Sequence, residues 1–126
     1  MSETTPSESE SYQLAAGHRE LLDQILDKWS LQVLERLFNR PSRFNDLRRE
    51  LPSVTGKSLT ATLRRLERNG IVERVVLDAR PVAVEYRITA LGKTLREPVD
   101  VLFDWSMTHM PAVDRARRRF DRQGMS

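Results

Sequence analysis

The stretch that decides the fold is residues 42–77, SRFNDLRRELPSVTGKSLTATLRRLERNGIVERVVL. Its first part predicts a short helix, which Ser42 can cap and which Pro52 ends. The apolar face of that helix consists of Phe44, Leu47 and Leu51. A longer helix follows a short turn, with Thr55 as its N-cap and Gly70 as the left-handed residue after its end. The stretch therefore predicts two helices joined by a tight turn.

The longer helix, residues 55–69, has two contrasting faces. Leu59, Leu63 and Leu66 lie within about 60° of one another at 100° per residue, so they must face the core. The other side carries small or basic residues and no acid, namely Lys57, Ser58, Thr60, Ala61, Arg64, Arg65 and Arg68. A helix in the major groove needs small side chains near its start and cations that hold phosphates further along. The alternative is the solvated basic face of an ordinary helix.

The segment after this pair predicts a hairpin. Residues 71–77 are rich in β-branched side chains, and residues 82–89 alternate between apolar and polar. Thr89 can cap a last long helix, in which Pro98 should introduce a kink.

Two further helices are predicted before the pair, the first with an apolar period from Leu14 and the second capped by Asp27. The order α-α-α-α-β-β-α is that of a winged helix-turn-helix, a mainly α fold with a small β-hairpin wing. We expect a disordered leader over 1–11, the winged domain over 12–110 and a basic tail over 111–126.

The positive charge of the chain is concentrated in this domain. The 126 residues carry a net charge of +3, but residues 40–80 hold ten bases and five acids. Arg43 and Arg49 belong to the short helix and its approach, and Arg80 lies at the expected tip of the hairpin. Three elements thus place cations on one plausible surface, which indicates a polyanionic partner, double-stranded DNA.

The composition argues against several other functions. Cysteine is absent, so disulfides, thiolate metal sites and cysteine nucleophiles are excluded. The two histidines lie far apart with no acidic cluster around them, and the five glycines form no phosphate-binding loop. We therefore expect no enzyme activity, no metal and no cofactor. The first residues lack the features of a signal peptide and no apolar run can span a bilayer, so a cytoplasmic protein without membrane contact is predicted.

Six short motifs stand in an order and spacing that point to one family. They are DKWSL at 27–31, RFNDLRR at 43–49, KSLTATLRRLE at 57–67, NGIVER at 69–74, VEY at 84–86 and TALG at 89–92. Over about residues 14–107 the chain resembles the HxlR-type winged helix-turn-helix transcriptional regulators of bacteria and archaea, relatives of the MarR group.

The resemblance implies a homodimeric repressor or activator on a pseudo-palindromic operator. Residues 55–69 would be the recognition helix and residues 71–89 the wing, while the first and last helices would form the dimer interface. Two departures stand out. Many family members sense oxidants through an N-terminal cysteine, which this chain lacks, and Asp27 stands where the family usually has glycine.

The site residues follow from these faces. We expect base contacts from Lys57, Ser58, Thr60 and Ala61, and phosphate or wing contacts from Arg43, Arg49, Arg64, Arg65, Arg68 and Arg80, although Arg64 or Arg65 could instead read guanine. The dimer-interface candidates are Leu14, Leu22, Val99, Leu102, Phe103 and Trp105. Two alternative functions remain: a winged-helix protein–protein interaction module, and a sensor of an unidentified small-molecule effector bound near the dimer interface.

Overall fold

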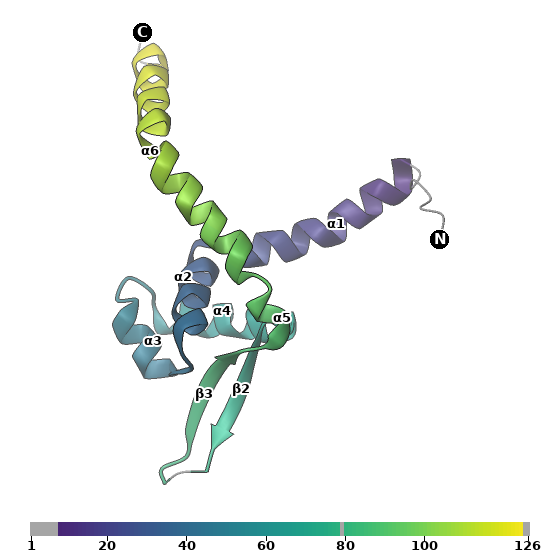
Figure 1. The fold of residues 1–126 in the computed structure, drawn as a ribbon, viewed down its shortest axis with the longest axis vertical. Coiled ribbons are helices and arrows are strands. Elements are labelled where there is room, and N and C mark those ends of the chain that lie inside the picture. The colour runs from purple at the N-terminus through teal and green to yellow at the C-terminus, as the bar shows by residue number, and fades with distance from the viewer. Residues whose placement is uncertain (1–7, 79, 125–126) are drawn as a thin grey trace. The chain divides into compact units, whose positions relative to one another are not determined.

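The computed structural model describes residues 8–78 and 80–124, with side chains from residue 15 onward. The chain forms two compact units, of which the first ends at Lys93 and the second begins at Thr94. The first unit contains α1 (Glu8–Ile25), α2 (Lys28–Asn39), β1 (Ser42–Arg43), α3 (Phe44–Glu50), α4 (Gly56–Arg68), β2 (Val72–Leu77), β3 (Ala83–Ile88) and α5 (Ala90–Lys93) (Figure 1). The second contains α6 (Arg96–Gly124).

The core of the first unit is built from leucine and valine on the inner faces of α2, α3 and α4. The largest fully buried apolar side chains are Val33, Leu34, Leu37, Leu47, Leu59, Leu63, Leu66 and Val72. The predicted inner face of α4 is therefore confirmed. Thr62 is also fully buried, which widens the core-facing side beyond the leucines alone. This phase leaves the basic side of α4 on the surface.

Three predicted helix-end signals are confirmed. The Asp27 side chain accepts a hydrogen bond from the backbone N–H of Trp29 at 3.1 Å. Thr55 Oγ1 likewise accepts from the backbone N–H of Ser58 at 3.0 Å, so it caps α4. Gly70 has φ 74°, the left-handed conformation in which a side chain is disfavoured. The bounds of α4 are thus set by its own sequence.

The prediction that Ser42 caps α3 is wrong. Ser42 lies in β1 and is buried, and the residue before α3 is Arg43, which forms no side-chain cap. The cause is tertiary, because β1 pairs with β3 and places Ser42 opposite Tyr86. Because β1 also includes Arg43, the backbone stays extended through Arg43, and α3 starts one residue later than a Ser42 cap would predict.

The predicted hairpin is confirmed as the wing. β2 and β3 pair antiparallel from Val72 opposite Ile88 to Leu77 opposite Ala83. The short β1 adds on the other side of β3, which gives a three-stranded sheet with the order β1-β3-β2. The sheet therefore ties the wing to the start of α3.

The end of the chain differs from the single kinked helix that the sequence predicts. Thr89 does act as a cap, since its Oγ1 accepts from the Gly92 backbone N–H at 2.9 Å, but that helix is the short α5. α6 starts at Arg96, so Pro98 falls in its first turn, where a missing N–H breaks no helical hydrogen bond. α6 continues through Pro111, and the predicted tail is helical up to Gly124.

At the other end, α1 begins at Glu8, inside the predicted leader over residues 1–11. The apolar period of this helix starts only at Leu14, so the hydrophobic pattern does not mark its first turns. Residues 1–7 of that leader lie outside the described residues. None of the described helices combines the length and the apolar character needed to cross a membrane.

Candidate nucleic-acid interface

The outer side of α4 presents one continuous row of side chains. Lys57, Ala61, Arg64 and Arg68 are all exposed and recur at the spacing of one helical face. Thr60 flanks this row and is exposed, whereas Ser58 is half-buried. The Thr60 hydroxyl donates to the Gly56 carbonyl at 2.8 Å, so its oxygen remains able to accept a hydrogen bond. Near the start of α4 the row therefore carries one cation, Lys57, and otherwise small side chains that project little from the helix.

The cations of α4 differ in what they contact. Neither Lys57 nor Arg64 forms an ion pair with any described residue. Arg65 instead points back to the first helices, because its Nη2 lies 3.8 Å from Asp27 Oδ2 and donates to Thr62 Oγ1 at 3.3 Å. Arg68 Nη1 lies 3.6 Å from Glu20 Oε1. The structure thus distinguishes Arg64 from Arg65, which the sequence could not rank.

The cations of α3 and its approach differ in the same way. Arg43 is exposed and has no ion-pair partner among the described residues, whereas Arg49 pairs with Asp46 one turn earlier on α3. Arg48 is not one of the contact residues that the sequence predicts. A Cβ added at Gly56 would lie 3.4 Å from Arg48 Nη1, so this guanidinium lies against the start of α4. Its basic character was visible in the sequence, but its position beside α4 was not.

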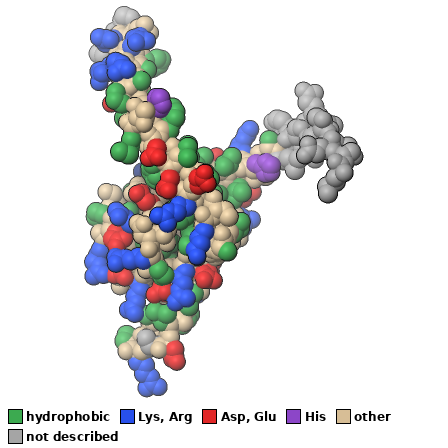
Figure 2. Space-filling view, in the orientation of Figure 1, with side chains coloured by type: hydrophobic (Ala, Val, Ile, Leu, Met, Phe, Trp, Pro, Cys, Tyr) green, Lys and Arg blue, Asp and Glu red, His purple; other side chains and the backbone are tan. Residues whose placement is uncertain are grey.

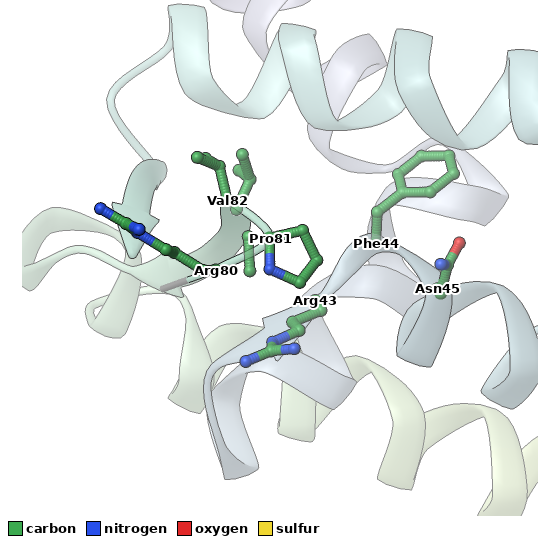
Figure 3. Close-up of a pocket in the computed structure, with 8 residues that line it drawn as sticks. Arg43, Phe44, Asn45, Arg80, Pro81 and Val82 are labelled. Carbon is green, nitrogen blue, oxygen red and sulfur yellow. The ribbon is translucent and has the colours of Figure 1, made fainter. Parts of the chain in front are cut away.

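A groove separates the approach to α3 from the wing. Its volume is about 470 Å³. It is lined by Arg43, Phe44, Asn45, Arg80, Pro81, Val82, Ala83 and Val84. Figure 3 shows Arg43 at the start of α3 and Arg80 on the wing, with the Arg80 guanidinium extending away from Pro81 and Arg43. The structure therefore brings together two predicted contact residues that are far apart in sequence.

A second hollow, of about 370 Å³, lies along the C-terminal half of α4. The described residues that line it are Arg64, Arg65, Glu67 and Arg68, of which three are cations. In the space-filling view, basic side chains cover much of the first unit and one lies at the tip of the wing (Figure 2). Acidic side chains are interleaved with them, so individual partners decide which cations are free.

The dimer-interface candidates are exposed to different degrees. Leu22 on α1 and Leu102 on α6 are about half exposed, and Trp105 is 57% exposed. Phe103 is half-buried, and Val99 is already buried at 3% exposure. The side chain of Leu14 lies outside those that the structure describes. Val101, Met107 and Phe120 are further exposed apolar side chains on α6, so the second unit carries much uncovered apolar surface.

Each of the two tryptophan rings lies close to a side chain of its own helix. Trp105 and His109 have ring centroids 5.0 Å apart on α6, and Lys28 Nζ lies 4.8 Å from the Trp29 ring centroid on α2. Within the described part of the chain, no three His, Asp or Glu side chains gather as metal ligands would.

The fold and this surface define the class of protein. A helix-turn-helix whose second helix is backed by leucine and followed by an antiparallel wing is a winged helix-turn-helix. The model of the HxlR-like helix-turn-helix family matches residues 24–114. The chain belongs to this family, and its relatives are named as helix-turn-helix-type transcriptional regulators.

Individual relatives agree with this assignment. Over 95 residues the chain is 36% identical to the helix-turn-helix-type transcriptional regulator YtfH of Escherichia coli strain K12. This aligned region covers 75% of each protein. The structure of YtfH from Salmonella typhimurium superposes with a TM-score of 0.72 at 35% identity, over 80% of this chain and 90% of that one. The redox regulator HypR in its reduced form gives a TM-score of 0.72 at 34% identity, over 79% of this chain and 98% of HypR.

Proposed function

We propose that this protein is a cytoplasmic, homodimeric regulator that binds a pseudo-palindromic DNA operator. The observation that carries the proposal is the outer row of α4, which has a leucine core behind it and two cations in front, Lys57 and Arg64, that pair with no acid among the described residues. An α-helix fits the major groove, and small side chains near its start allow a close approach to the base edges. α4 therefore serves as the recognition helix.

Contacts divide by position along α4. Lys57, Thr60 and Ala61 reach base edges, and Ser58 contributes from the side of the row. Arg64 follows one turn later, where its guanidinium either holds a phosphate or reads a guanine through paired hydrogen bonds. The base contacts specify sequence, while the phosphate contacts supply most of the affinity.

The wing and the start of α3 hold the DNA backbone. Arg43 and Arg80 line one groove from two elements, and both are exposed. Arg80 at the wing also suits a narrow minor groove, where the negative potential attracts arginine. Arg49 is already paired with Asp46, so it contributes less than Arg43 to phosphate binding.

A second copy of this chain completes the regulator. The uncovered apolar side chains of α6, among them Leu102 and Trp105, give a partner helix a surface to pack against. A two-fold dimer places its two recognition helices in successive major grooves, about one helical turn apart.

In-vitro selection from random duplexes tests the proposal. Full-length protein should enrich two inverted half-sites, and its affinity for the enriched duplex should fall steeply as salt rises. The matched control carries Lys57→Ala and Arg64→Ala, which remove two cations from the outer row but leave the core intact. The proposal fails if no sequence is enriched, if affinity ignores salt, or if an acidic polypeptide displaces the selected duplex at physiological salt.

A further inference from the structure

Three polar side chains near the junction of α1 and α2 contact the last half of α4. We call Glu20, Gln24 and Asp27 the acidic strap. Glu20 Oε1 lies 3.6 Å from Arg68 Nη1, and Asp27 Oδ2 lies 3.8 Å from Arg65 Nη2. Between them, Gln24 Oε1 accepts a hydrogen bond from Asn69 Nδ2 at 2.8 Å. The strap thus follows α4 from Arg65 to its C-terminal end.

Gln24, the neutral member of the strap, links Glu20 to the residue after the end of α4. Gln24 Nε2 donates to Glu20 Oε1 at 3.5 Å, while its carbonyl oxygen accepts from Asn69. Asp27 is fixed separately, because it also caps α2 through the Trp29 N–H. The two carboxylates therefore stay beside α4 for reasons that do not depend on the arginines.

The strap neutralises half of the cationic charge on α4. Arg65 and Arg68 are two of its four cations, and they line the same hollow as Arg64. Their ion pairs are open to solvent, with side-chain exposures of 37% and 36% for Arg65 and Asp27, and 70% and 62% for Arg68 and Glu20. Exposed pairs of this kind contribute little to folding stability. The arginines are consequently held by partners that an anion can displace.

We propose that Glu20 and Asp27 are built-in competitors of DNA phosphate for Arg68 and Arg65. This inference rests on the proposed function and adds a control of affinity to it. A phosphate contact is independent of sequence, so the competition lowers the affinity of α4 for any duplex. Glu20 and Asp27 are positioning residues, because they act on DNA binding only through the two arginines.

The variant that tests this carries Glu20→Gln and Asp27→Asn in the full-length chain. Asparagine caps a helix about as well as aspartate, so α2 keeps its start. The Gln24–Asn69 hydrogen bond is unchanged. The matched control is Asp23→Asn, which removes one negative charge from an exposed position on the same helix and has no ion-pair partner among the described residues. Binding is measured by fluorescence anisotropy on a random-sequence duplex over a series of salt concentrations.

The double variant should bind about five- to tenfold more tightly at low salt, given the usual strength of two exposed ion pairs. Each arginine released to a phosphate should steepen the slope of log affinity against log salt by about 0.9, so the protomer gains up to about 1.8. Asp23→Asn should give a much smaller change, and thermal melts should stay close to wild type.

A double-mutant cycle tests whether Glu20 changes DNA binding through Arg68. If Glu20 acts through Arg68, then Glu20→Gln should change the salt slope in the wild-type background and leave it unchanged in the Arg68→Gln background. The inference is overturned if the double variant matches Asp23→Asn in slope while the wild type binds DNA. If the wild type shows no salt-dependent binding to any duplex, the proposed function itself is overturned.

Discussion

Neighbouring arginines on α4 allow a sharp test of the proposed interface. Arg64 and Arg65 have the same chemistry and are adjacent in sequence, but among the described residues only Arg65 has side-chain partners, Asp27 and Thr62. We predict that Arg64→Ala weakens operator binding more than Arg65→Ala. Arg64 has no ion pair to break among the described residues, whereas Arg65 is paired with Asp27.

The magnitude follows from the number of contacts. A dimer loses two Arg64 side chains, so the salt slope should fall by about 1.8 if each one holds a phosphate. If Arg64 instead reads guanine, each half-site should lose about 1–3 kcal/mol and the preference for that base should relax. For Arg65→Ala the loss should be smaller by up to about 1 kcal/mol per protomer, because Asp27 competes with DNA phosphate for the wild-type side chain.

Anisotropy titrations of both variants against the selected operator, over a series of salt concentrations, measure these quantities. Both side chains lie outside the core, so melting curves should overlay that of the wild type. Equal losses for the two variants, or a larger loss for Arg65→Ala, would refute the assignment of the outer row.

Three further predictions concern the scaffold and the assembly. Leu63→Ala should lower the free energy of unfolding by about 2–5 kcal/mol, because Leu63 is 1% exposed; a denaturant melt that matches wild type would contradict the phase of α4. Gly92→Ala should destabilise the protein by about 1–3 kcal/mol or more, since the new Cβ would lie 2.2 Å from the Ile71 carbonyl oxygen, and calorimetry checks this. Replacing both Leu102 and Trp105 by alanine should weaken self-association, and sedimentation velocity that shows an unchanged dimer would place the interface elsewhere.

Much of the first unit could be predicted because its signals are local. The inner face of α4 follows from the spacing of Leu59, Leu63 and Leu66, and its ends follow from the Thr55 cap and Gly70. The wing follows from the alternation in residues 82–89. Each of these features depends on residues that are close together in sequence. The local sequence therefore favours the same helix and strands that the fold contains.

Other features required the folded chain. Ser42 carries a good local cap signal, yet pairing with β3 places it in a strand. The break between α5 and α6 is likewise absent from the apolar period, which runs through both.

The same division holds for the candidate interface. The sequence by itself determined which side of α4 is basic, because helical periodicity assigns every residue to a face. Only the tertiary structure decided which of those cations are free. Their partners come from distant segments, as the ion pairs of Arg65 with Asp27 and of Arg68 with Glu20 illustrate. An ion pair between such segments depends on how helices pack, and no local pattern of residues encodes it.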